Sequence, residues 1–216
     1  MKRTMKLVIS FAALITAALL FVGCASSGYK QGNKAADSIQ TASSGIAALQ
    51  SHITQTLMAL NSLVDGPQTD LRPQFKALDS KISGLESAAK KVANERVQVG
   101  EQTRKYLADW DAEIGQIQNA DIKARSQSRK ADVAQQIEVV KRSYSAFDMA
   151  LRPFLADLQD VRKYLSVDLT RSGVAALKAP AIKANADAAP LQDAIAKLSA
   201  DFKALGVAMS SVTAAK

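Results

Sequence analysis

The chain has 216 residues, a length typical of one domain or two small ones, and 48% of its residues are apolar. Its net charge is +8, and without Lys2, Arg3 and Lys6 the remaining 25 basic and 20 acidic residues give +5. A surplus of this size is typical of solvated helix faces, and weak attraction to anionic lipid is the alternative. The single cysteine excludes an internal disulfide and a cysteine metal cluster. Aromatic residues are few, and no window shows the alternation of Val, Ile and Thr that is typical of strands, so the sequence predicts helices rather than sheets.

The first 23 residues have the organisation of a bacterial export signal. Three positive charges lie within residues 1–6, and residues 7–23 follow without a charge. As a helix, this uncharged run of 17 residues would span only about 25 Å, which is short for crossing a bilayer. We therefore expect residues 1–23 to be a lipoprotein signal peptide, with an uncleaved single-span anchor as the alternative.

The signal ends in a tetrapeptide that resembles the lipobox, the motif read by the lipoprotein signal peptidase. Val22, Gly23 and Cys24 fit this motif, whereas Phe21 replaces the preferred leucine. The resemblance implies cleavage before Cys24, a thioether-linked lipid on its sulfur and acylation of its amine, and such multiple acyl chains anchor a protein stably. Alanine rather than aspartate follows the cysteine, which in the sorting pattern of such lipoproteins implies the outer membrane, with the protein facing the periplasm.

A tether is expected between the lipid and the folded domain. Residues 24–34 are small and polar and include two glycines, a composition typical of flexible linkers. Fully extended, the stretch would reach about 35 Å.

Apolar residues at coiled-coil spacing predict four helical segments within residues 35–209. The first stripe covers residues 39–64, and Gly66 is suited to the left-handed position past the end of this helix. Thr69 or Asp70 can cap the segment that follows.

The second and third stripes cover residues 75–117 and 137–165. Between them we expect a reversal near Asn119, which tolerates a left-handed bend, with Asp121 as the cap of the next helix. One unbroken helix through this point is the alternative. Pro153 lies inside the third stripe, and the regular spacing on both sides favours a kink over a stop.

Residues 170–190 are alanine-rich and contain one glycine and two prolines, which predicts a short helix and a connector. The last stripe covers residues 191–209, and we expect residues 210–216 to form a frayed tail.

Together these elements predict an all-α fold, a long antiparallel coiled-coil helical hairpin with two shorter helices packed at one end. The hairpin would be about 70 Å long, and the shorter helices would cover only the end near Leu71 and Leu165. The other end would project as a polar arm, and two such arms can pair between molecules. Four basic residues form the predicted interaction tip of this arm: Lys123, Arg125, Arg129 and Lys130.

From Tyr106 onward, the order of features resembles the bacterial family of unknown function DUF2959. The resemblance rests on these residues: Trp110 to Ile114, Arg125, Ser126, Tyr144, Leu151 to Pro153, Leu158, Tyr164 to Leu169 and Val174 to Leu177. It implies a helical exported lipoprotein and no known chemistry.

Catalytic equipment is not expected. His52 is the only histidine and lacks the partners of a catalytic triad or a zinc site. Asp109 and Glu113 flank Trp110 as a carboxylate pair could in a glycosidase, but they lie on a helix that offers no cleft. We expect no enzyme, cofactor, metal site or nucleic-acid binding. The favoured hypothesis is a lipid-anchored structural, scaffold or adaptor protein with a protein partner or self-association. The alternative is a carrier with an apolar crevice between helices, near Ile46, Phe75, Phe154 and Phe202. Linkage of Lys216 to peptidoglycan is a further hypothesis.

Overall fold

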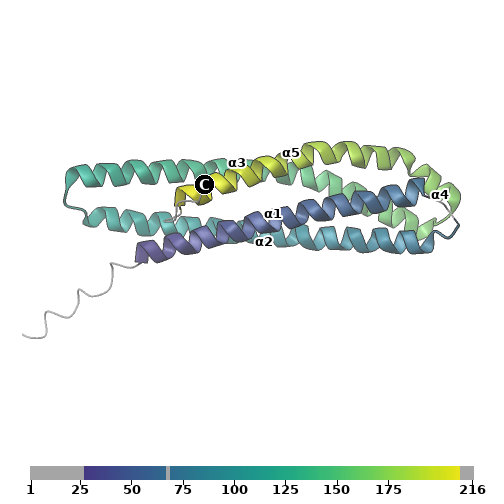
Figure 1. Cartoon of the computed structure of the whole chain (residues 1–216), viewed down its shortest axis with the longest axis horizontal. Helices are drawn as coiled ribbons and strands as arrows, with labels where there is room; N and C mark the ends of the chain where they lie inside the picture. The colour runs from purple at the N-terminus through teal and green to yellow at the C-terminus, as the bar shows by residue number, and fades with distance from the viewer. Residues whose placement is uncertain (1–26, 67–68, 210–216) are drawn as a thin grey trace, which may run out of the picture.

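The computed structural model describes residues 27–66 and 69–209. Five helices make up this part of the chain: α1 (Ser27–Asp65), α2 (Arg72–Gln116), α3 (Ala120–Val167), α4 (Arg171–Ala176) and α5 (Lys178–Met209). No strand occurs among the described residues, which confirms the all-α prediction (Figure 1).

The four long helices form an elongated antiparallel bundle (Figure 1). α1 packs against α2 and α5, and α3 packs against the same two helices, so that the chain passes around the bundle in sequence order. The short connections dictate this arrangement, because a helix that follows a tight turn lies beside the one before it.

The predicted apolar stripes form the core between these helices. Its largest fully buried side chains come from all four long helices: Ile46, Leu49, Ile53, Leu60, Leu63, Leu78, Ile82, Leu85, Phe154, Leu158, Leu165 and Phe202. α3 continues through Pro153, whose ring is exposed, which confirms that this proline does not end the helix.

The turn between α2 and α3 confirms the expected reversal and excludes the single unbroken helix. Its details differ from the prediction, because Asn119 has extended backbone angles rather than left-handed ones. The Asn119 side chain accepts the amide hydrogens of Asp121 and Ile122 at 3.0 and 3.1 Å. Asn119 is therefore the cap of α3, and Asp121 lies in its first turn.

The predicted connector before residue 191 is wrong, because α5 is helical from residue 178 onward. Pro180 lies in the first turn, where a missing amide hydrogen costs nothing, and Pro190 is exposed on the solvent side. The alanines of this stretch extend the buried stripe toward the α4 end of the bundle: Ala181, Ala184 and Ala188. Alanine has the highest helix propensity, which outweighs the interruption by Pro190.

The predicted tether is also wrong over residues 27–34, which form the first two turns of α1. Gln31 Nε2 donates to Gln102 Oε1 of α2 at 2.9 Å. A Cβ at Gly32 would lie 3.2 Å from the Tyr106 ring, so this glycine allows close packing rather than flexibility. Ala35 follows as a fully buried contact.

Gly66 does not adopt the predicted left-handed conformation, since no glycine of the described chain has a positive φ. Its amide donates to Ser62 O at 3.1 Å, and a Cβ there would lie 2.3 Å from that oxygen. A side chain at Gly66 would therefore collide with the last turn of α1, which explains the glycine at this position. The N-cap position of α2 is Leu71 rather than Thr69 or Asp70, and it makes no side-chain cap hydrogen bond. Asp70 precedes it and accepts the amide hydrogen of Arg72 at 3.1 Å.

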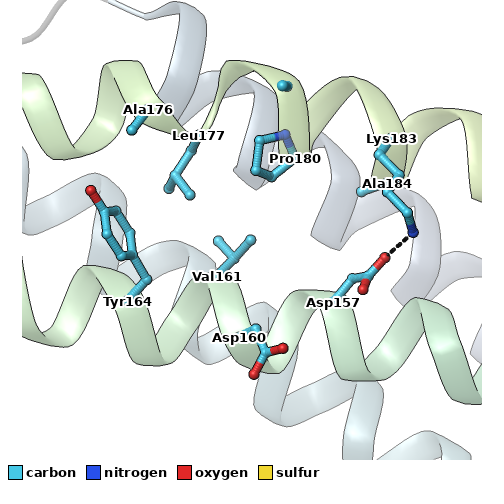
Figure 2. A pocket seen from close by; sticks show the side chains of 10 residues that line it. Asp157, Asp160, Val161, Tyr164, Ala176, Leu177, Pro180, Lys183 and Ala184 are labelled. Carbon is cyan, nitrogen blue, oxygen red and sulfur yellow. Dashed lines mark hydrogen bonds and ion pairs between the residues drawn. The ribbon is translucent and has the colours of Figure 1, made fainter.

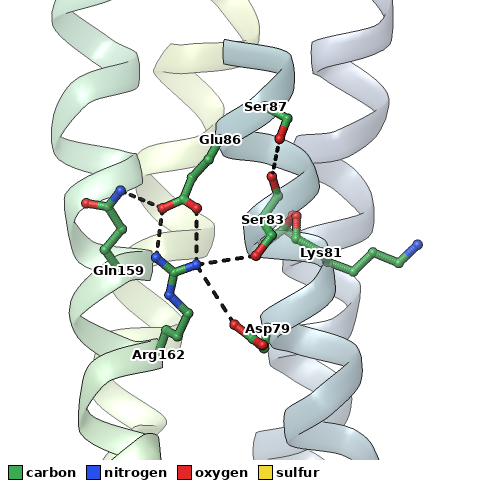
Figure 3. Close-up of polar contacts among 8 residues, drawn as sticks. Asp79, Lys81, Ser83, Glu86, Ser87, Gln159 and Arg162 are labelled. Atoms are coloured by element: carbon green, nitrogen blue, oxygen red, sulfur yellow. Dashed lines mark hydrogen bonds and ion pairs between the residues drawn. The ribbon is translucent and has the colours of Figure 1, made fainter. Parts of the chain in front are cut away.

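An ion-pair cluster joins α2 to α3 beside the core (Figure 3). The Arg162 guanidinium donates to both carboxylate oxygens of Glu86, at 2.8 and 3.1 Å, and Gln159 Nε2 donates to Glu86 at 2.7 Å. Asp79 Oδ1 lies 3.9 Å from Arg162. The hydrogen bonds from Arg162 hold the pKa of Glu86 below its usual range. This group, called the Arg162 clamp below, fixes the register of the hairpin.

Candidate functional site

The arm predicted at the α2–α3 turn is present but shorter than expected. Both helices extend past the start of α1 and the end of α5 (Figure 1). α1 begins at Ser27 rather than near residue 35, and α5 is longer than predicted, so both cover more of the hairpin.

Two side-chain contacts hold the arm together. Trp110 Nε1 of α2 donates to Ser126 Oγ of α3 at 2.9 Å, and the Trp110 and Tyr106 ring centroids are 5.3 Å apart. Lys130 pairs with Asp111 across the same two helices. The polar arm is therefore a defined two-helix structure.

The four predicted tip residues separate into two groups. Arg129 donates to the carbonyl oxygen of Ala208 near the end of α5, and Lys130 is paired with Asp111, so both lie at the base of the arm. Lys123 and Arg125 lie nearer the turn, in the first two turns of α3. Ile122 beside them is 56% exposed, which leaves an apolar side chain at the end of the molecule.

A buried carboxylate between α1 and α2 was not predicted. The Glu95 side chain is 11% exposed, and neither of its oxygens has a hydrogen-bond partner among the described residues. Lys91 Nζ lies 3.8 Å away, and a Cβ at Gly45 would lie 1.9 Å from Glu95 Oε2. Burial raises the pKa of Glu95. The alternating spacing of the α2 stripe leads from Val92 to position 96, so it does not mark position 95 as buried.

Polar groups also meet the core where α2, α3 and α5 approach each other. The Tyr144 hydroxyl donates to the Val92 carbonyl at 3.0 Å, its ring packs edge-on against Phe202, and the Arg96 guanidinium lies 5.3 Å from its centroid. Burial raises the pKa of Tyr144. The hydroxyl group is therefore a neutral donor that fixes α3 against α2.

A groove lies between α3 and the α4–α5 segment, at the opposite end of the bundle from the arm (Figure 2). Its volume is about 610 Å³. Its floor is apolar, and polar side chains form its rim: Val161, Leu177, Pro180 and Ala184 on the floor, and Asp157, Asp160, Tyr164 and Lys183 around it. We call it the distal groove.

Charged pairs organise one side of the distal groove. Lys183 of α5 pairs with Asp157 of α3 and with Asp187 at 2.6 Å, and these hydrogen bonds raise the pKa of Lys183. On the other side, burial raises the pKa of Tyr164, whose hydroxyl donates to Asp168 at 3.3 Å. Asp160 is exposed between these groups.

Residues 21–205 match the family described as "Protein of unknown function (DUF2959)". The chain belongs to this family. The resemblance seen from Tyr106 onward is thus confirmed over a longer stretch of sequence. No curated protein and no solved structure matches the chain.

Several predicted features of this DUF2959 member lie outside the described residues, namely the expected signal peptide over residues 1–23, the lipidation site Cys24 and the expected tail with Lys216. Within the described ranges, no helix is long and apolar enough to span a membrane. The same ranges contain no group of three or more side chains suited to a metal ion. His52 is half-buried against Gly84, and Asp109 and Glu113 lie on the arm.

Proposed function

We propose that this DUF2959 member is a lipid-anchored cell-envelope protein of structural, scaffold or adaptor type, without catalysis, that holds its α4 end away from the membrane. The lipid is on Cys24, and the outer membrane, facing the periplasm, is the proposed location.

The start of α1 carries this proposal. Ser27 follows Cys24 by three residues, so a lipid on Cys24 attaches the membrane directly to the bundle. α1 then runs without interruption for 39 residues, a length of about 58 Å. The distal groove and the α4 turn would therefore be presented at a fixed distance from the membrane, as a scaffold requires.

The anchor is tested first, by mass spectrometry of the mature N-terminus and by fractionation of Cys24→Ser. We expect a cysteine bearing a diacylglyceryl group, and loss of processing and membrane attachment in the variant. A Cys24→Ser protein that is still processed and membrane-bound would contradict the proposal.

The scaffold role is tested by photo-crosslinking in cells. A photoreactive residue at Val167 or Ile182, which are 88% and 72% exposed near the α4 end, is expected to give discrete adducts with an envelope component. Val97, 56% exposed near the middle of α2, is the matched control and should give fewer adducts. Monomer alone at every position would argue strongly against a scaffold.

A carrier of small apolar molecules is the second candidate, and the distal groove favours it. Its volume of about 610 Å³ lies within the range of small-molecule sites. The crevice predicted from the sequence lay elsewhere, around Ile46, Phe75, Phe154 and Phe202. Three of these side chains are fully buried in the core, and Phe75 is partly buried against it. The groove at the α3–α5 surface replaces that crevice as the place where a ligand would bind.

Binding of a fluorescent fatty-acid analogue tests the carrier. Ala176→Trp, at the rim of the groove, should abolish saturable binding, whereas Ala156→Trp, exposed on α3 outside the groove, should leave it unchanged. Equal binding by both variants, or no binding by the unaltered protein, would remove the carrier hypothesis.

A further inference from the structure

The arm and the lipid attachment point lie at the same end of the molecule. α1 and α2 are antiparallel, so the start of α1 lies beside the last turns of α2 (Figure 1). The Gln31–Gln102 hydrogen bond and the contact of Gly32 with Tyr106 set this register. α2 continues for about 10 Å beyond the level of Ser27 before the turn.

The chain between Cys24 and Ser27 is too short to separate the bundle from the membrane. Three residues span at most about 11 Å even when fully extended. The bundle body of about 58 Å therefore cannot lie on the membrane side of Ser27, and in the proposed orientation it extends away from the surface. In that orientation the α2–α3 turn is on the membrane side.

The side chains at this end suit a phospholipid surface. Ile122 is 56% exposed, and Ile117 in the turn is half-buried. Residues 117–126 contain two basic residues and one acidic residue, and Lys30 and Lys34 are exposed at the start of α1. An apolar tip with adjacent Lys and Arg is the composition of segments that lie in the headgroup region of anionic membranes.

We infer that the arm tip (residues 117–126) is a second membrane contact, in which Ile122 enters the headgroup region and Lys123 and Arg125 pair with lipid phosphates. This inference rests on the proposed lipid anchor. The lipid holds the tip at the surface, so a weak contact suffices, and the two contacts together set the angle at which the bundle stands.

The test uses the mature lipidated protein in vesicles of two parts phosphatidylethanolamine and one part phosphatidylglycerol. Because Cys24 is the only cysteine and bears the lipid, Ile122→Cys introduces the one thiol available for an environment-sensitive fluorophore. We expect a blue shift in its emission and quenching by nitroxide-bearing lipids. Val167→Cys, an 88% exposed apolar position at the far end of α3, is the matched control and should show neither.

Charge reversal provides the second measurement. Lys123→Glu with Arg125→Glu should reduce quenching at position 122, whereas Lys163→Glu with Lys178→Glu, both exposed near the α4 end, should not. Circular dichroism establishes that each variant is folded.

Each remaining outcome has a defined meaning. A lipidated protein whose label at position 122 is neither shifted nor quenched would overturn this inference and leave the anchor intact. A shift without quenching by nitroxide lipids would indicate a second copy on the arm and would also overturn it. An N-terminus without lipid would overturn both the anchor and the membrane contact.

Discussion

Glu95 shows how a single residue can weaken the bundle that contains it. Its two carboxylate oxygens are buried without hydrogen-bond partners in the described chain, and such a group costs about 1–3 kcal/mol. We expect Glu95→Leu to raise the free energy of unfolding by about this amount at pH 8, measured by urea denaturation. Glu101→Leu, exposed on the same helix, is the control and should be close to neutral.

The same group predicts a pH dependence. Because burial raises the pKa of Glu95 above 4.5, the folded protein holds a proton that the unfolded chain has released. Stability should therefore fall as the pH rises from about 4.5 through the folded pKa of Glu95. The free energy of unfolding of Glu95→Gln should no longer show this fall with rising pH, whereas that of Glu101→Gln should still show it. An unchanged profile in Glu95→Gln would show that the carboxyl group is solvated.

Two glycines respond in opposite directions to the same substitution. A Cβ at Gly173 would lie 2.4 Å from the Asp168 carbonyl oxygen, whereas a Cβ at Gly100 has no atom within 4 Å. Gly173→Ala should destabilise the protein by about 1–3 kcal/mol through the forced backbone shift. Gly100→Ala should stabilise it by about 0.5–1 kcal/mol, because alanine loses less conformational entropy in a helix. Thermal unfolding of both variants measures the contrast.

At the scale of helices, the Arg162 clamp is expected to contribute more than a surface ion pair. Arg162 and Glu86 are each 29% exposed and share two hydrogen bonds, so a double-mutant cycle with Arg162→Ala and Glu86→Ala should give a coupling of about 1 kcal/mol. The exposed Lys141–Glu138 pair is the control and should give about 0.3 kcal/mol.

The coupling should also depend on pH. Since Arg162 lowers the pKa of Glu86 below 4.5, its contribution is present above pH 4.5 and is lost as the pH falls through the folded value. A coupling that persists below that value would assign the stabilisation to packing of the two side chains.

The predictability of these helices depended on residue size. Large residues at regular spacing, such as Phe147 and Leu158 in α3, could be assigned to the core from the sequence because only one helix face can bury them. Ala181 and Ala188 could not be assigned to the core, because alanine is common on every face of a helix. The start of α5 was missed for this reason. Glu95 was missed because burial of a carboxylate without a hydrogen-bond partner opposes the physical preference on which the prediction depends.

Features formed between helices were the least predictable. The distal groove depends on how α4 turns the chain from α3 to α5, and no spacing within one helix encodes that angle. The arm was predicted because the residues near Lys123 are polar, but its length depends on where α1 and α5 end. Arg129 and Lys130 were therefore placed at the tip when they lie at its base.

At the scale of the whole molecule, the bundle divides into a covered body and an uncovered arm. Residues 112–128 contain one buried side chain, Ile114, whereas α3 beyond residue 133 contributes a buried residue at nearly every turn. Local opening is easiest where few apolar contacts must break. The arm should open without unfolding of the body.

Amide hydrogen exchange of the soluble, unlipidated bundle tests this division. We expect residues 112–128 to exchange well before residues 78–92 and 137–165, because α1 and α5 cover the latter and leave the former exposed to water. Ser126→Ala, which removes the acceptor of the Trp110 hydrogen bond, should accelerate exchange in the arm alone. Ser145→Ala, exposed in the middle of α3, is the control and should leave both regions unchanged. The arm could instead be as strongly protected from exchange as the body, with a protection that increases with protein concentration. That result would mean that arms pair between molecules and that the arm is buried in a dimer.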